Sequence, residues 1–239
     1  MSASLSEHSV FASRPVGDIA ATLPGATAVF RRTKLDFCCG GRASLAAAAA
    51  AKGLDLTRLE AELADLVAAA RPAEPPVETD ALIDRILTRF HDVHRRELPE
   101  LTRLARRVEA VHRAHADVPA GLADLLEQIT VDLESHMRKE EQVLFPMMRR
   151  ESDRMSGQQA GQQVDRHPMI GQPIAMMVAE HDDHGAYLRR LEALTHDFIP
   201  PADACPTWRA LYTGARKFAD DLVEHIHTEN NILFPRFAG

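Results

Sequence analysis

Apolar residues in the second half of the chain recur at intervals of three or four positions. One such run passes through Leu122, Leu126, Ile129 and Leu133, continues at the same spacing through His136 and Glu140, and reaches Leu144. This period places the side chains on one face of an α-helix. Four amphipathic helices are predicted in this way, over residues 81–112, 120–149, 172–197 and 207–234. At about 1.5 Å per residue each is roughly 40 Å long, the size expected of a four-helix bundle.

A smaller helical unit is predicted ahead of these segments, because LTRLEAELADLVAAA also has helical spacing and no segment alternates as a β-strand does. The proline-rich stretch RPAEPPVETD separates the two patterns. We therefore expect an all-α protein, with a four-helix up-down bundle and a small helical N-terminal domain. The predicted division is a domain at 1–70, a linker at 71–80 and the bundle at 81–239.

Composition narrows the classes of partner. Apolar residues make up 45% of the chain and charged residues 26%, which is typical of a soluble globular protein. The net charge is −7 and no long Lys/Arg run occurs, so neither nucleic acid nor an anionic membrane is an expected partner. The N-terminus does not resemble a secretory signal and no apolar run is long enough to span a bilayer, so a cytoplasmic location is expected.

The four amphipathic segments contain a repeat. HMRKEEQVLFP at 136–146 and HIHTENNILFP at 225–235 share the pattern HxxxExxxLFP. HDVHRREL at 91–98 and HDDHGAYL at 181–188 share HDxHxxxL. His91 of the first HDxHxxxL motif lies 45 residues before His136, and His181 of the second lies 44 residues before His225. A helix pair used twice, related by an approximate two-fold axis, is therefore predicted.

The repeated His and Glu carry the candidate chemistry. Residues four apart lie on one helix face, and this face is otherwise Leu and Ile, so the side chains point into the core. A buried carboxylate without a partner costs several kcal/mol, which a bound cation would offset. A single HxxxE pair is more often an exposed ion pair, but two copies at matching separation indicate a dinuclear metal site.

Each of the other two helices adds a histidine from its inward face. Four imidazoles and two carboxylates are more donors than one metal ion needs, whereas two ions bridged by the Glu residues use them all and leave room for a small molecule. Mixed imidazole and carboxylate ligation suits iron or manganese, and less often zinc. Spacing alone does not decide between His91 and His94, or between His181 and His184.

These motifs resemble the hemerythrin-like di-iron bundle, and the whole chain is similar to the iron–sulfur cluster repair di-iron proteins. The matching elements are FCCGG, FHDVHRRELPEL, SHMRKEEQVLFPM, EHDDHGAYL, PPADACPTW and HIHTENNILFPR. The resemblance implies that the first His of each HDxH is an iron ligand and that His94 and His184 lie beside the site. It implies two iron ions per chain, bridged by Glu140 and Glu229. The implied metal ligands are His91, His136, Glu140, His181, His225 and Glu229.

The resemblance also implies a function. Such a protein repairs iron–sulfur clusters damaged by nitric oxide or oxidative stress, by mobilising iron or by consuming nitric oxide at the di-iron site. The implied partners are damaged iron–sulfur proteins, nitric oxide or dioxygen, and a second copy in a homodimer. Whether it is an enzyme, with nitric oxide reductase-like activity, or a non-enzymatic iron donor stays open. The alternative is a hemerythrin-like carrier or sensor of dioxygen or nitric oxide, which would not need a cysteine-bearing domain.

Cys38 and Cys39 are adjacent in DFCCGG, although the chain has only three cysteines. We expect Gly40 and Gly41 to let the backbone turn sharply there, and a helix in RASLAAAAAAKG to begin just afterwards. The positive end of that helix would lower a thiol pKa. Our hypothesis is a thiol site that offers two sulfurs to iron, to nitric oxide or to the client cluster; the alternative is that the cysteines are buried packing residues. Cys205 is expected to be structural.

Overall fold

The computed structural model describes residues 11–69, 77–157 and 170–237 of the chain. Within these ranges the secondary structure is helical, without a strand, and one isolated antiparallel bridge joins Pro15 to Ser44. The predicted all-α class is confirmed. None of the helices in the described ranges combines the length and apolarity needed to cross a membrane. Most of the linker predicted at 71–80 lies outside the described residues, so the predicted domain boundaries stay a prediction.

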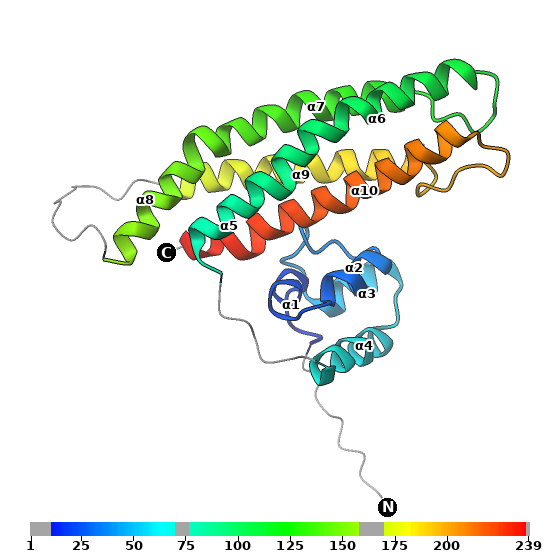
Figure 1. Ribbon diagram of the computed structural model, residues 1–239. Helices are drawn as coiled ribbons and strands as arrows, with labels where there is room; N and C mark the ends of the chain where they lie inside the picture. The colour runs from blue at the N-terminus through cyan, green and yellow to red at the C-terminus, as the bar shows by residue number, and fades with distance from the viewer. Residues whose placement is uncertain (1–10, 70–76, 158–169, 238–239) are drawn as a thin grey trace, which may run out of the picture. The chain divides into compact units, whose positions relative to one another are not determined.

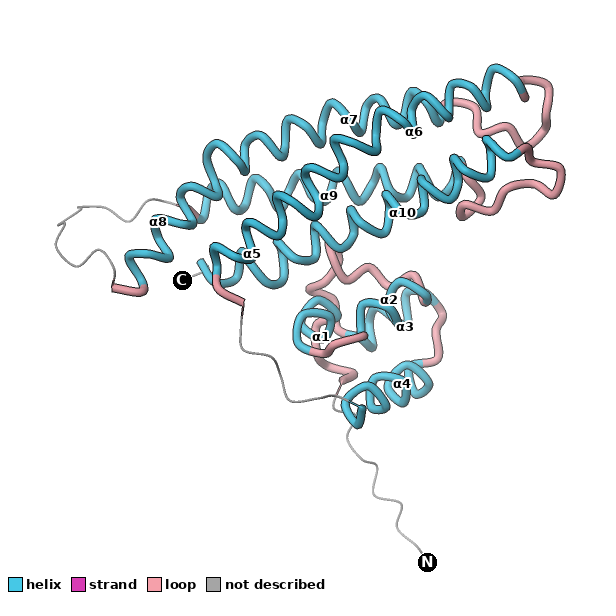
Figure 2. Tube along the Cα trace, viewed as in Figure 1, coloured by secondary structure: helices cyan, strands magenta, loops and turns pink. Residues whose placement is uncertain are grey.

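Four long helical stretches lie alongside one another and form the bundle (Figures 1 and 2). The helix α6 packs against α7, and α7 packs against α9. The apolar stripe predicted from Leu122 to Leu144 is buried in the bundle core. The four stretches are, in order, α5 (Thr79–Ile86), η1 (Leu87–His91) and α6 (Asp92–Val111); α7 (Leu122–Lys139), η2 (Glu140–Leu144) and α8 (Phe145–Met155); α9 (Gly171–Leu194); and α10 (Pro206–Thr228), η3 (Glu229–Leu233) and η4 (Phe234–Phe237).

Three of these stretches contain a π-helical turn, η1, η2 and η3. The turns η2 and η3 begin at the Glu of each HxxxE motif and are followed within two residues by Pro146 and Pro235. A proline has no N–H for the carbonyl four residues earlier, and widening the turn lets a later N–H reach that carbonyl. Such turns frequently occur at functional sites, and here each of the three contains a predicted metal ligand.

The N-terminal part of the chain forms four shorter helices, α1 (Val16–Thr22), α2 (Ala26–Arg32), α3 (Leu45–Lys52) and α4 (Leu56–Ala69). Fully buried apolar side chains from each of them, such as Ile19, Phe30, Leu45 and Leu63, form the core. The helix α3 begins after Ser44, whose Oγ accepts a hydrogen bond from the backbone N of Ala47 at 3.2 Å. This is a standard N-terminal cap.

By its internal contacts the chain divides into two compact units. The second unit comprises Val77–His225 and Leu233–Gly239, and the first comprises Met1–Pro76 together with the short helical segment Ile226–Ile232. Two side-chain amides of that segment hold the backbone of the cysteine loop. Asn230 Nδ2 donates to the carbonyl of Cys38 and Asn231 Nδ2 to that of Phe37, both at 3.1 Å. The first unit is therefore built from two parts of the chain that are far apart in sequence.

Candidate metal centre

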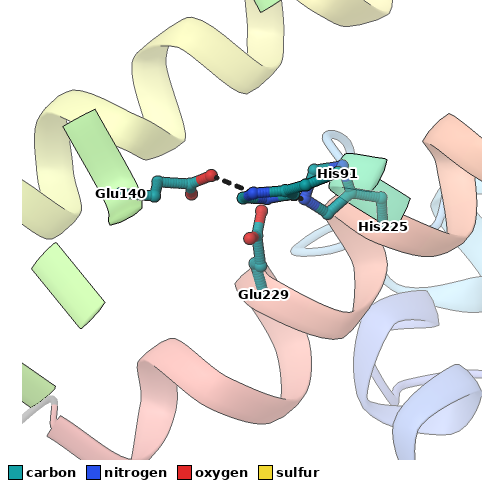
Figure 3. A group of neighbouring side chains, drawn as sticks. All are labelled: His91, Glu140, His225 and Glu229. Atoms are coloured by element: carbon teal, nitrogen blue, oxygen red, sulfur yellow. Dashed lines mark hydrogen bonds and ion pairs between the residues drawn. The ribbon is translucent and has the colours of Figure 1, made fainter. Parts of the chain in front are cut away.

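Four of the predicted ligands converge in one group (Figure 3). His91 is the last residue of η1 and His225 lies near the end of α10, while Glu140 and Glu229 are the first residues of η2 and η3. One donor atom from each of the four lies within 4.8 Å of the others, and all four side chains are buried. In Figure 3 the two carboxylates approach the two imidazoles from different helices.

A second group, of the same composition, contains His136 and His181 in place of His91 and His225. It uses Glu140 and Glu229 again, with all donor atoms within 4.8 Å of one another. The structure thus brings all six predicted ligands together, in two groups that share both carboxylates. Their arrangement follows the sequence repeat, since each half contributes two histidines and one glutamate.

The carboxylate of Glu140 faces both groups. Its Oε2 lies 3.4 Å from Nε2 of His91, and its Oε1 lies 3.4 Å from Nε2 of His136. Within each group the two imidazoles also converge, because Nε2 of His91 is 3.1 Å from Nε2 of His225 and the corresponding distance between His136 and His181 is 3.1 Å. This geometry can place one cation in each group, with one oxygen of Glu140 available to each.

The electrostatic setting favours cations. Glu140 and Glu229 are both 0% exposed, and burying a carboxylate costs several kcal/mol unless a positive charge or hydrogen bonds compensate it. Burial, and next the neighbouring His91, hold the pKa of His225 well below its ordinary value. The ring of His225 is therefore neutral, which is the form of imidazole that binds a metal ion.

Aromatic rings cover the centre in a pattern that also follows the repeat. Phe145, from the first LFP motif, stacks on His91 with ring centroids 5.9 Å apart. Phe234, from the second LFP motif, stacks on His181 at 6.0 Å. The phenylalanine of each motif therefore fixes the orientation of one histidine and adds an apolar wall to the site.

Comparison with known proteins gives the relationship of the whole chain. Residues 82–237 match the family described as "Hemerythrin HHE cation binding domain", and residues 12–67 match a family described only as a domain of unknown function. An iron–sulfur cluster repair protein YtfE of Dickeya chrysanthemi is 46% identical over 92% of this chain and 95% of its own length. The chain belongs to the iron–sulfur cluster repair protein family. The predicted family is confirmed, and the bundle of this member is a cation-binding domain.

Two further relatives support this assignment over nearly the whole chain. The YtfE repair protein of Citrobacter koseri is 44% identical, over 95% of this chain and 97% of its own length. A probable iron–sulfur cluster repair protein of Haemophilus influenzae is 43% identical, with the same coverage of 95% and 97%. The similarity to the repair family therefore includes the N-terminal unit as well as the bundle.

The structure adds residues around the predicted ligands that sequence reasoning missed. Glu141 accepts a hydrogen bond from Nδ1 of His91 at 2.8 Å. Arg95 donates to both oxygens of that carboxylate, at 2.8 and 3.1 Å, and to Glu134 at 2.8 Å. A carboxylate on the outer nitrogen of a histidine fixes the tautomer that presents the other nitrogen to a metal. The signal in the sequence was the second Glu of KEEQ, directly after Glu140.

The second donor group of this repair-family bundle has a corresponding pair. Glu180 accepts from Nδ1 of His136 at 2.8 Å, and Lys139 forms an ion pair with the same carboxylate. The hydrogen bond from His136 is the main reason that the pKa of Glu180 falls to about 2; burial opposes this effect and Lys139 adds to it. Glu180 thus stays ionised. Its position directly before His181 was the signal available in the sequence.

His94 and His184, the alternatives left open by spacing, lie beside the two groups. His94 is 1% exposed, between Phe90 and Phe218, and neither of its ring nitrogens has a hydrogen-bond partner among the described residues. Burial, followed by the charge on His136, lowers the pKa of His184 to about 3. His184 lines a cleft of about 500 Å³, whose walls also include Asp132, Lys139, Glu180 and Tyr187.

The cysteine loop differs from our expectation. Cys38 and Cys39 lie in a bend several residues before α3, which starts at Leu45, and not directly before the helix N-terminus as expected. The pKa of Cys38 is raised well above its ordinary value, first by its hydrogen bond with Cys39 and next by burial, with a further contribution from Asp36. For Cys38 the predicted lowering of the pKa was therefore wrong.

The backbone bends and turns over residues 38–42, as expected for the two glycines after the cysteines, but without a left-handed conformation at either glycine. Neither Gly40 nor Gly41 has a positive φ. Gly41 is required by a close approach instead, because a Cβ there would lie 2.7 Å from the carbonyl oxygen of Phe37. Cys205 is half-buried with its Sγ 3.2 Å from Nε2 of His112, and its structural role stays a prediction.

Proposed function

We propose that the bundle binds two iron ions, one held by His91 and His225 and the other by His136 and His181, with Glu140 and Glu229 bridging them. The observation that carries this proposal is the placement of Glu140, whose two oxygens each lie 3.4 Å from Nε2 of a different ligand histidine. Buried, mixed imidazole and carboxylate donors suit iron. Iron in such a site would supply redox chemistry and an open position for a small molecule.

We further propose that the protein repairs iron–sulfur clusters damaged by nitric oxide or oxidative stress. Support comes from the relatives named as iron–sulfur cluster repair proteins, which match both the bundle and the N-terminal unit. Damaged iron–sulfur proteins are then its partners. Iron that is passed on to a damaged cluster is cargo. Cys38 and Cys39 are the proposed thiol site, which offers its two sulfurs to iron or nitric oxide leaving the bundle, or to the client cluster, since thiolates are soft ligands for iron.

The chain's own residues contribute to this function in three ways. Glu141 and Glu180 orient His91 and His136 so that Nε2 faces the metal position. Phe145 and Phe234 cover two of the ligand rings and exclude water from that side. The cleft beside His184 is also lined by Glu180, which holds His136, and we propose it as the route by which small molecules approach the centre.

A repair assay with matched variants tests the proposal. An iron–sulfur enzyme is inactivated with nitric oxide or peroxide, and recovery of its activity is followed after adding iron-loaded protein. His181→Leu should lower bound iron from two to one or fewer per chain and should abolish recovery. The matched control is His184→Leu, from the same HDDH motif, which should keep both irons. Equal iron content in the two variants would contradict the assigned ligands.

A second candidate function is a carrier or sensor of dioxygen or nitric oxide at the same centre. The first unit, with its pair of adjacent cysteines, favours repair, because reversible gas binding does not need thiols. Anaerobic consumption of nitric oxide by the reduced protein, compared with reversible dioxygen binding, separates the two. The same measurement separates a nitric oxide reductase-like enzyme from a simple iron donor. A cytoplasmic location and a homodimer stay predictions.

A further inference from the structure

Asp36, Cys38 and Cys39 form a second group of converging donors, within the first unit. Their sulfur and carboxylate atoms lie within 4.8 Å of one another. Sγ of Cys38 is 3.6 Å from Sγ of Cys39 and 3.5 Å from Oδ1 of Asp36. Side chains of adjacent residues in an extended chain point in opposite directions. The two sulfurs can therefore lie close together only because the backbone of the loop is bent.

Asp36 builds this bend. Its Oδ1 accepts hydrogen bonds from the backbone N of Cys38 at 3.2 Å and of Cys39 at 3.0 Å. This turn folds the chain back on the carboxylate and brings both thiols to the same side. The same residue therefore shapes the loop and adds an oxygen donor to the two sulfurs.

The spacing of the sulfurs is that of a metal chelate. Two thiolates bound at about 2.3 Å to one tetrahedral ion lie about 3.8 Å apart. A disulfide instead brings its sulfurs to about 2.05 Å. The observed 3.6 Å between the two Sγ atoms is close to the first value and far from the second.

The loop is also held from the outside. Asn230 and Asn231 donate to the carbonyls of Cys38 and Phe37, both at 3.1 Å. The donors differ in exposure, since Cys38 is buried, Cys39 is half-buried and Asp36 is exposed. Three ligands with one exposed side leave a coordination position that water or a donor from another molecule can occupy, as in sites where metal-bound groups exchange.

We propose that Asp36, Cys38 and Cys39 form a second metal site, for one thiophilic divalent cation such as iron(II) or zinc(II), with an open position for exchange. The inference deepens the proposed role of Cys38 and Cys39 as a thiol site and rests on that role, although none of its donors belongs to the histidine and glutamate centre. It assigns Asp36 a role as ligand that the sequence did not suggest. Soft sulfur donors with a single oxygen distinguish this site chemically from the bundle centre.

Cobalt(II) is the probe that tests the site, because cobalt bound by thiolate gives a sulfur-to-metal charge-transfer absorption that histidine and carboxylate ligands do not. The full chain, freshly reduced and kept anaerobic, is titrated with cobalt(II), and bound metal is counted after desalting. We expect the charge-transfer absorption in the wild-type protein. The double variant Cys38→Ser/Cys39→Ser should lose it together with one bound ion per chain.

Two matched pairs of variants assign the ligands. Cys205→Ser should keep the absorption, because Cys205 is the one cysteine outside the loop. Asp36→Asn retains an oxygen that can accept from the two backbone N–H groups but removes the charged ligand, so it should weaken cobalt binding tenfold or more while the fold stays intact. Asp65→Asn, an exposed acid of α4, should bind cobalt like the wild type.

Opposite outcomes overturn the proposal. It fails if the double variant keeps the charge-transfer absorption, if Cys205→Ser removes the absorption, or if Asp36→Asn binds as tightly as Asp65→Asn. Iron bound by the bundle is counted in parallel in the same double variant. Loss of the cobalt–thiolate absorption from the double variant with unchanged bundle iron supports the second site. In the wild-type protein, absence of bundle iron alongside the cobalt–thiolate absorption contradicts only the proposed di-iron centre.

Discussion

Nδ1 of His91 lies 2.8 Å from Oε1 of Glu141. Because a carboxylate can only accept, the imidazole donates its Nδ1–H and presents the lone pair of Nε2 to the interior. Arg95 holds the same carboxylate through two further hydrogen bonds. The orientation of the His91 ring, a proposed metal ligand, is therefore set by Glu141, which Arg95 in turn holds in place.

The first prediction concerns this chain of contacts. Glu141→Gln should lower the affinity of the bundle for iron by about ten- to a hundredfold, because the neutral amide is a weaker acceptor and no longer fixes the tautomer of His91. Iron affinity is measured by competition with a chelator. The matched control is Glu134→Gln, which loses a contact to Arg95 but none to a ligand histidine, and it should bind iron nearly normally. Equal losses in the two variants would assign the effect to Arg95 instead.

The second prediction concerns His94, whose buried ring has no hydrogen-bond partner among the described residues. His94→Leu replaces it with an apolar side chain of similar size, so the free energy of unfolding should stay within about 1 kcal/mol or increase. Urea unfolding and an iron count check the variant. Two irons per chain should remain, whereas His91→Leu should lose iron. A clear loss of iron from His94→Leu would indicate that His94 is a ligand, and would contradict the assignment of the first His of the HDxH motif.

The sequence was sufficient for the bundle because its signals are periodic and repeated. The predicted apolar stripe from Leu122 to Leu144 is buried in the observed core. The repeated motif HxxxExxxLFP predicted that Glu140 and Glu229 would lie together, and in the structure both belong to each of the two donor groups. In each case a long helix converts spacing in sequence directly into position in space. The three π-helical turns could not be predicted from the apolar pattern, because one widened turn hardly changes its 3.6-residue period.

Features that depend on contacts between distant segments could not be predicted. Asn230 holds a carbonyl 192 positions earlier in the chain, and nothing in the local sequence indicates that contact. Nothing in the local sequence distinguishes Glu141 and Glu180 from surface charged residues, because their hydrogen bonds to His91 and His136 form between different helices. The raised pKa of Cys38 likewise follows from its contact with Cys39 and from burial, whereas local reasoning considered only a nearby helix end.

The third prediction concerns stability in acid. Asp221 accepts from Arg89 at 2.6 Å and from Lys217 at 2.8 Å. Burial raises the pKa of Asp221, but these two hydrogen bonds outweigh burial and the net pKa is lowered. A carboxyl whose pKa is lowered by folding stabilises the protein above its unfolded pKa, about 3.9. That contribution is lost as the pH falls through the folded value.

Asp221→Asn should therefore lower the free energy of unfolding by about 1–3 kcal/mol at neutral pH, and the difference from wild type should shrink below about pH 4. Urea unfolding at a series of pH values measures both effects. Asp182, in α9, is exposed, so Asp182→Asn is the control and should change stability little. A deficit of Asp221→Asn that stays constant down to low pH would show that its charge is not the cause.

The fourth prediction concerns packing of the cysteine loop against α1. A Cβ on Gly41 would lie 2.7 Å from the carbonyl oxygen of Phe37 and 3.1 Å from Cα of Gly17. Both obstacles are backbone atoms, so Gly41→Ala cannot be relieved by a rotamer change and should destabilise the first unit by about 1–3 kcal/mol. Amide hydrogen exchange, read by mass spectrometry, should accelerate across α1 to α4. Gly171→Ala, where a Cβ meets nothing within 4 Å, is the control and should leave exchange unchanged. If α1 to α4 of Gly41→Ala exchange as slowly as in the wild-type protein, the close approach at Gly41 is disproved.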